Sequence, residues 1–160
     1  MSRLSKYLIT TICFSLNTHL IAHNVQGTNA LALDNAIKAA NANVGLDSTV
    51  VIQGSVFMND QVRALGAKPN FTWDPNAILV TGVNDAEGIK PTLTGEGNNR
   101  GFFVGGKDST AGLVTIQNLN FNELRAKGGD GNGGGMGAGG ALFVGKNTQV
   151  FVENCGFLNC

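Results

Sequence analysis

Apolar and polar positions follow two different patterns along the chain. Between residues 33 and 40, apolar residues stand at positions 33, 36, 37 and 40, which is the spacing of one face of an α-helix. The pattern predicts one short amphipathic helix over residues 32–42. No later segment keeps helical spacing for more than a turn, so we expect the rest of the chain to be built from other elements.

After residue 48 the apolar residues come in short β-branched runs, most of which end at Gly or Asn. Runs of this kind are typical of strands, since Val, Ile, Thr and Phe pack well on a pleated surface. They predict strands over residues 49–57, 77–82, 92–95, 102–104, 113–116, 142–144 and 150–152. The 23 glycines agree with this reading, because glycine disfavours helix interiors.

An internal repeat organises the second half of the chain. Residues 114–124 (VTIQNLNFNEL) and 150–160 (VFVENCGFLNC) align without gaps at an offset of 36. In the first copy the apolar alternation runs to Asn118 and then resumes one position out of phase. Because Asn tolerates left-handed backbone, this phase slip predicts a corner between two strands whose apolar residues both face inward.

Copies of such a unit cannot bury their inner faces alone, so they must stack. The repeat therefore predicts an all-β fold, a parallel β-helix (a solenoid), with the helix at 32–42 as a short N-terminal cap. Identical residues should then lie over one another. Asn118 and Asn154 would form a ladder of side-chain amides, the alternative being two independent turn asparagines.

The N-terminus has the features of a secretory signal. Arg3 and Lys6 precede an apolar run at residues 7–16, which is too short to span a bilayer as a helix. Cleavage sites with small residues occur at 20–22, 28–30 and 30–32, and the last fits A-x-A best. We expect residues 1–32 to be a signal peptide and 33–160 to be the N-terminal coils of a β-helix that is incomplete at its C-terminal end. The alternative is an ordinary buried N-terminal segment.

Charge and cysteine content narrow the class of protein. Basic and acidic residues both number 11, and only 14% of residues are charged, which argues against nucleic-acid binding through a basic surface. Three cysteines without a CxxC argue against a cysteine zinc site. Cys155 and Cys160 occupy the repeat positions of Leu119 and Leu124. We therefore expect buried free thiols, with a disulfide as the alternative.

Two segments carry candidate binding residues. The glycine tract at 127–140 favours a flexible excursion, with a calcium loop or a phosphate cradle as alternatives. The Pro-bounded segment 69–75 holds Trp73, which could be part of a lid or a platform for a sugar ring. It also contains the glycosylation sequon Asn70-Phe71-Thr72.

Candidate catalytic groups are few. His19 and His23, the two histidines, both lie in the predicted signal, and the carboxylates are scattered with no repeated acidic pair. Arg100 could bind an acidic sugar or pair with Glu96. We therefore predict no catalytic, cofactor-binding or metal-ligating residues, and no cofactor.

Several motifs suggest a family. The segments TLTGEG (92–97), RGFFV (100–104), VTIQNLNF, GGALFV and VFVENCGF resemble the start of bacterial right-handed parallel β-helix surface proteins of the autotransporter passenger and polymorphic outer-membrane type. Gly139-Gly140-Ala141-Leu142 matches their GGA[ILV] motif, and Phe151–Asn154 fits their FxxN motif. Residues 157–160 stand at the expected place of another FxxN but end in Cys.

The resemblance implies a right-handed coil and an exported protein, secreted or held at the bacterial outer membrane or cell surface. It implies a non-catalytic module, the passenger part of an autotransporter-like adhesin, whose partner is a host or cell-surface molecule or a glycan. We expect no nucleic-acid partner and no membrane span beyond the cleaved signal, and the oligomeric state stays open. The alternative function is a polysaccharide lyase or glycoside hydrolase of the pectate-lyase-like β-helix class.

Overall fold

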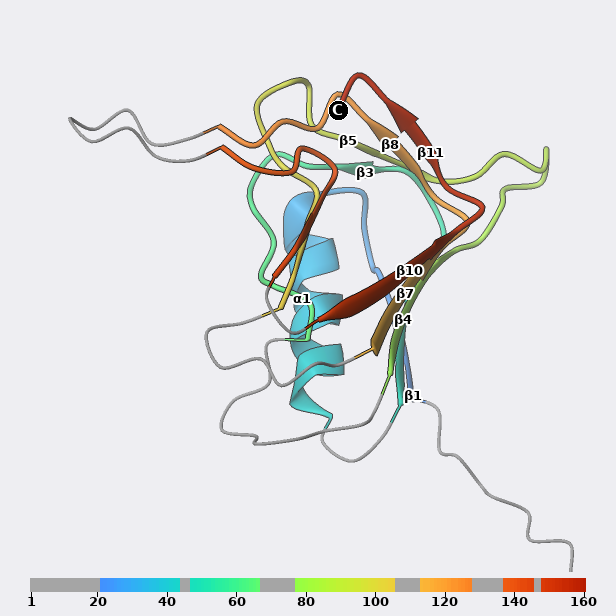
Figure 1. The fold of residues 1–160 in the computed structure, drawn as a ribbon. Helices are drawn as coiled ribbons and strands as arrows, with labels where there is room; N and C mark the ends of the chain where they lie inside the picture. The colour runs from blue at the N-terminus through green and yellow to red at the C-terminus, as the bar shows by residue number, and fades with distance from the viewer. Residues whose placement is uncertain (1–20, 44–46, 67–76, 106–112, 128–136, 146–147) are drawn as a thin grey trace, which may run out of the picture.

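The structure is a computed structural model that describes residues 21–43, 47–66, 77–105, 113–127, 137–145 and 148–160 (Figure 1). Each of the predicted strand segments contains a strand, and the segment 49–57 contains two. The elements, in chain order, are β1 (Ile21–Asn24), α1 (Ala30–Ala42), β2 (Ser48–Ile52), β3 (Val56–Phe57), β4 (Ile78–Gly82), β5 (Thr92–Thr94), β6 (Phe102–Val104), β7 (Leu113–Gln117), β8 (Asn120–Asn122), β9 (Leu142–Val144), β10 (Gln149–Glu153) and β11 (Gly156–Leu158).

The predicted helix is confirmed and begins two residues earlier than expected. The Asn29 side chain caps its first turn by accepting a hydrogen bond from the backbone N–H of Ala32 at 3.0 Å. Its apolar face packs against β1, β2 and β3. The buried apolar residues of this face are Ala30, Leu33, Ala36, Ile37 and Ala40. Within the described ranges, no helix has the length and apolar character needed to cross a membrane.

All the strands of the described residues pair in parallel, in three sheets. The five-stranded sheet has the order β1-β2-β4-β7-β10, the four-stranded sheet β11-β8-β5-β3, and the two-stranded sheet β6-β9. In Figure 1, β4, β7 and β10 lie one in front of the other on one side, and β3, β5, β8 and β11 lie on a second side. Side chains from the three sheets and from α1 meet in one apolar core.

The predicted fold class, an all-β right-handed parallel β-helix (solenoid) with a short capping helix, is wrong. The described residues form three separate parallel sheets and a 13-residue helix, with no solenoid, and this arrangement is of the α/β type. The helix is the crossover between β1 and β2, a parallel pair, and parallel neighbours need a long crossover connection. The sequence analysis missed this unit because β1 falls inside the predicted signal.

The stacking of the two repeat copies at an offset of 36 is confirmed. Strand β10 pairs with β7 so that Val150 faces Val114, and β11 pairs with β8 so that Phe157 faces Phe121. The two phenylalanine rings are nearly parallel, with an interplanar angle of 6° and centroids 4.9 Å apart. The repeat thus fixes the register between successive strands of a sheet.

The asparagine ladder is also confirmed. Asn154 donates its side-chain N–H to Asn118 Oδ1 at 2.9 Å, and Asn118 in turn donates to Asn84 Oδ1 at 2.6 Å and to the Gly82 carbonyl at 2.8 Å. Asn118 and Asn154 have φ angles of 58° and 50°, the left-handed backbone expected for the corners. Gly82 lies so close to this corner that a Cβ atom there would clash with the Asn118 carbonyl oxygen.

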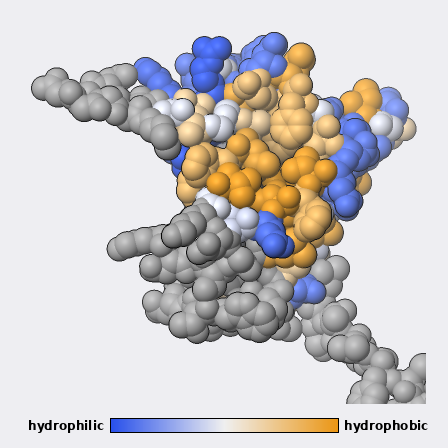
Figure 2. Space-filling model, in the orientation of Figure 1, coloured by the Kyte–Doolittle hydropathy of each residue, from blue (hydrophilic) through white to orange (hydrophobic). Residues whose placement is uncertain are grey.

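The prediction for the two cysteines is half right. Both Cys155 and Cys160 are free thiols, but Cys155 is only half-buried and Cys160 is exposed. Their counterparts Leu119 and Leu124 are fully buried. The difference arises because β10 and β11 end their sheets, so no described strand covers their outer edges. Figure 2 shows apolar surface gathered over this face.

Candidate ligand-binding pocket

A basic pocket opens beside the two-stranded sheet, with a cavity volume of about 140 Å³. This is close to the volume that accommodates one six-membered ring in an engineered protein cavity. Three cationic side chains, two amides, two aromatic rings and two methyl groups form its walls. They belong to Arg100, Arg125, Lys127, Gln61, Asn98, Phe103, Phe143, Ala126 and Ala138.

A tight turn after β5 positions the polar wall. Glu96 and Gly97 have positive φ angles of 48° and 71°, and the N–H of Asn98 closes the turn by donating to the Gly95 carbonyl at 2.9 Å. The loop after β8 is bonded to this turn, because Arg125 donates its backbone N–H to the Asn99 carbonyl at 2.9 Å. Residues far apart in sequence therefore line one cavity.

Arg100 is the cation that lies beside the aromatic wall of the pocket. Its guanidinium carbon lies 5.4 Å from the centroid of the Phe103 ring, within the range of a cation–π interaction. Its Nε atom is buried and has no hydrogen-bond partner among the described residues. In the described part of the chain Arg100 forms no ion pair with Glu96, which was one of the two predicted roles. Arg100 lines the pocket, and a guanidinium group can bind an anion there through paired hydrogen bonds.

The aromatic wall follows from strand register. Phe103 of β6 pairs with Phe143 of β9, and their rings stack with centroids 4.9 Å apart at an interplanar angle of 14°. The Cβ positions of Ala126 and Ala138 extend this apolar wall. An anion alone would lose hydration against such a surface, whereas a ligand with an apolar face would gain contact.

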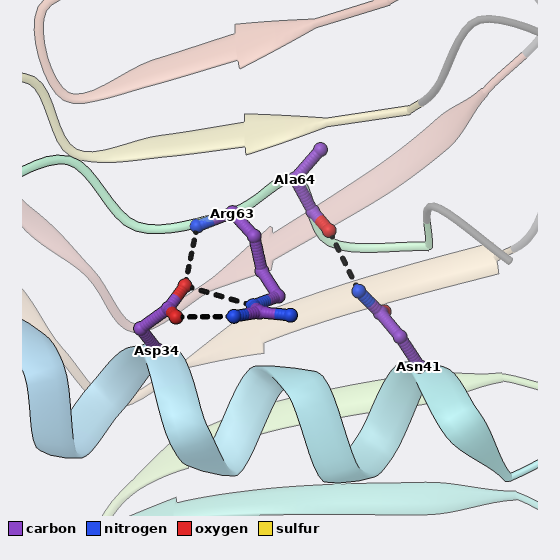
Figure 3. Close-up of polar contacts among 4 residues, drawn as sticks. All are labelled: Asp34, Asn41, Arg63 and Ala64. Atoms are coloured by element: carbon purple, nitrogen blue, oxygen red, sulfur yellow. Dashed lines mark hydrogen bonds and ion pairs between the residues drawn. The ribbon is translucent and has the colours of Figure 1, made fainter.

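A clamp on α1 holds the segment that contributes Gln61 (Figure 3). Asp34 accepts from the Arg63 backbone N–H at 2.7 Å and from its guanidinium at 2.6 and 2.9 Å. About two turns further along the same side of α1, Asn41 donates to the Ala64 carbonyl at 2.8 Å and accepts from the Gly66 N–H at 2.9 Å. These bonds fix the connection after β3 against the helix.

The same clamp shifts the titration of its partners. The hydrogen bonds from Arg63 hold the pKa of the Asp34 carboxyl below its usual value, although burial opposes the shift. The carboxylate in turn raises the pKa of Arg63. This ion pair joins Asp34 of α1 to Arg63 in the connection after β3, so it fastens that connection to the helix.

The charged side chains in the described lining of the pocket are all cationic. Its described lining carries three cationic residues and no carboxylate, imidazole or thiol. Guanidinium groups bind carboxylates, phosphates and sulfates through paired hydrogen bonds, and a partly enclosed site strengthens the attraction. The lining can therefore bind and orient an anion, but it holds no obvious general base for proton transfer at neutral pH.

Other sequence predictions fall outside this site. Trp73, the sequon at 70–72 and the glycines at 128–136 lie outside the described residues. Among the described carboxylates, Asp47 accepts from the Ala77 N–H, and Asp85 accepts from the N–H groups of its own turn. No group of three His, Cys, Asp or Glu side chains suited to a metal gathers in the described ranges.

Sequence reasoning singled out Arg100 but missed the rest of the pocket. Arg125 and Lys127 lie in a loop about 25 residues later, and the pairing of β5 with β8 and the backbone bonds between the turns that follow them bring these residues together with Arg100. One available signal was the match of Phe103-Val104-Gly105 with Phe143-Val144-Gly145 at an offset of 40. That match places Phe103 and Phe143 at equivalent positions, and these two residues form the aromatic pair.

Comparison with protein family models, curated proteins and solved structures found no match to this chain. The resemblance to bacterial surface proteins therefore stays a prediction that rests on the motifs alone.

Proposed function

We propose that this chain is an exported, non-catalytic recognition module of a secreted or cell-surface protein of the autotransporter-adhesin type, and that it binds an anionic glycan in the basic pocket. The observation that carries the proposal is the lining itself: three cations and no carboxylate among its described residues, beside a stacked aromatic pair.

The mixed chemistry of the walls favours a carboxylated or sulfated sugar over a bare anion. Arg100 and Arg125 can bind the acidic group, while the amides of Gln61 and Asn98 can both donate to and accept from hydroxyl groups. The aromatic wall can contact the apolar face of a sugar ring. A uronic acid combines all three features in one ring, which suits the size of the cavity.

The absence of an acid–base pair from the described lining favours binding without turnover. A glycoside hydrolase of the usual kind needs two carboxyl groups on either side of the bond, and none lines the described pocket. Export is supported by the N-terminal sequence, in which Arg3 and Lys6 precede the apolar run at 7–16.

The test is a binding measurement on the purified full chain. Titration calorimetry with an oligogalacturonate should show binding that weakens as salt rises, and a neutral oligosaccharide of equal length should bind far more weakly. Arg100→Gln should weaken binding by about tenfold or more, since a hydrogen bond to a charged group contributes ~1.5–3 kcal/mol. Lys38→Gln removes the same charge from an exposed position on α1 and should leave the affinity unchanged.

Three outcomes would contradict the proposal. Equal binding of the neutral and acidic sugars, or equal effects of Arg100→Gln and Lys38→Gln, would exclude the pocket as an anion site. Release of cleaved sugar, measured by chromatography of the incubated glycan, would make the module an enzyme and overturn the proposal.

A further inference from the structure

The segment between residues 21 and 32 belongs to the folded domain, although sequence analysis places it in a signal peptide. Strand β1 pairs with β2 over four registered residue pairs, from Ile21 opposite Ser48 to Asn24 opposite Val51. Hydrogen bonds at both ends extend the pairing. Ile21 donates its N–H to the Asp47 carbonyl at 3.2 Å, and Val25 donates to the Val51 carbonyl at 2.9 Å.

Side chains and turns of this segment are bonded to the remainder of the domain. The imidazole of His23 lies 2.8 Å from the side-chain nitrogen of Asn43, just beyond the end of α1. The Thr28 carbonyl accepts from the Phe57 N–H at 2.7 Å. Each bond joins the segment to an element that lies C-terminal to it in the chain.

The start of α1 also depends on residues of this segment. Asn29 is its N-cap, and Ala30 donates its N–H to Asn59 Oδ1 at 3.2 Å. The Ala30 side chain is 1% exposed, whereas its neighbour Leu31 is 66% exposed. The helix therefore needs residues 29 and 30 both for its first turn and for its packing.

Cleavage at any of the three sites with small residues would damage this structure. A cut after Ala22 divides β1, and cuts after Ala30 or Ala32 remove β1 together with the helix cap. Signal peptides are removed from extended chains before folding, so the fold does not block the cut. Instead, the product of such a cut would lack the edge strand of the five-stranded sheet and leave β2 unpaired on that side.

We infer that export processing of this chain takes place N-terminal to Ile21 and that the mature domain keeps residues 21–32. The inference rests on the export part of the proposed function. Within the first twenty residues, Cys13-Phe14-Ser15 places small residues one and three positions before a bond, directly after most of the apolar run. A signal peptidase would hydrolyse the bond after Ser15 with one water molecule, leaving a carboxyl group on Ser15 and a free amino group on Leu16.

The first experiment expresses the full chain in a bacterium, separates exported from cytoplasmic protein and measures the intact mass of the exported form. The expected N-terminus is Leu16, and another export cut that leaves Ile21 in the mature chain also supports the inference, whereas an exported form that has lost at most Met1 would overturn it. An exported form that begins at His23, Leu31 or Leu33 would overturn the inference while leaving export intact. Full-length chain that stays in the cytoplasm would overturn the proposed export and the processing step with it.

A second experiment tests the structural basis without export. In the full chain purified from the cytoplasm, Ala30→Arg should lower the urea midpoint of unfolding markedly or abolish the cooperative transition, because it forces a charge into the core. The matched control Leu31→Arg introduces the same side chain at the exposed neighbouring position and should leave the midpoint unchanged. Equal midpoints for the two variants would show that the segment is dispensable and would overturn the inference.

Discussion

The two copies of the repeat share a sequence pattern and a register but differ sharply in burial. In the first copy the inward residues Ile116 and Phe121 are 0% and 1% exposed. Their counterparts in the second copy, Val152 and Phe157, are 41% and 52% exposed. Strands β7 and β8 have a described neighbour on each side, whereas β10 and β11 have one on a single side. Burial in stacked parallel strands is therefore set by the number of covered sides, even where the pattern is the same.

The largest predicted difference in stability between the two copies concerns the stacked phenylalanines, Phe121 and Phe157. Phe121→Ala should lower the free energy of unfolding by about 3–5 kcal/mol, as expected for a large buried side chain. Phe157→Ala should lower it by only about 1–2 kcal/mol, because half of its surface already faces solvent. Urea unfolding followed by circular dichroism measures both values, and Phe151→Ala should cost about as little as Phe157→Ala, because the two residues are 54% and 52% exposed. Similar losses for Phe121→Ala and Phe157→Ala would contradict the unequal burial.

The asparagine corners offer a second, smaller contrast. Asn118→Gly should cost about 1–3 kcal/mol, since it removes bonds to the corners before and after it. Asn154→Gly should cost less, because Asn154 joins the ladder on one side only and otherwise meets the exposed Lys90. Glycine adopts positive φ without strain, so the two variants compare the side chains alone. A larger loss for Asn154→Gly in chemical unfolding would mean that the ladder is not what stabilises the corner.

The smallest effect concerns the clamp on α1. The pKa of Asp34 is lowered in the folded protein, so its contribution is fully present above the pKa of the unfolded carboxyl and is lost as the pH falls through the folded value. Because Arg63 is partly exposed, we expect this contribution to be below ~1 kcal/mol. The unfolding midpoint of Asp34→Asn should fall below that of the natural chain at neutral pH, and the two should converge as the pH is lowered below the usual pKa of an aspartate. A constant difference across this range would assign the effect to something other than ionisation.

Periodicity predicted the helix and the strands well because both depend on local pattern. The spacing at 33, 36, 37 and 40 marks the face that α1 buries, and the offset of 36 gave the correct pairing of β10 with β7. The fold class was not predictable in the same way. Two copies of a repeat define how strands stack, whereas the sheets and the crossover helix depend on β1, whose short sequence resembles part of an export signal.

The binding pocket was harder to predict, since it is created by contacts between turns. Nothing local in the sequence relates Arg125 to Arg100, and the bond from the Arg125 N–H to the Asn99 carbonyl exists only after stacking. The cysteines show the converse case. Their chemistry as free thiols followed from the residues that they replace, but their exposure depends on what covers the final strands.

The asparagine ladder also has a direction. Asn118 donates its amide N–H to Asn84 Oδ1, and Asn154 donates its own to Asn118 Oδ1, so both bonds run toward the preceding corner. The aligned amide dipoles therefore add, with their negative end at Asn154 Oδ1. Lys90 Nζ lies 2.7 Å from that oxygen and 2.9 Å from the backbone carbonyl of the same residue, so an ammonium charge terminates the polarised row. The row of asparagine amides therefore resembles the C-terminus of a helix, where a cation stabilises the negative end of the dipole. Here the cation is Lys90, which lies 64 residues before Asn154 in the sequence.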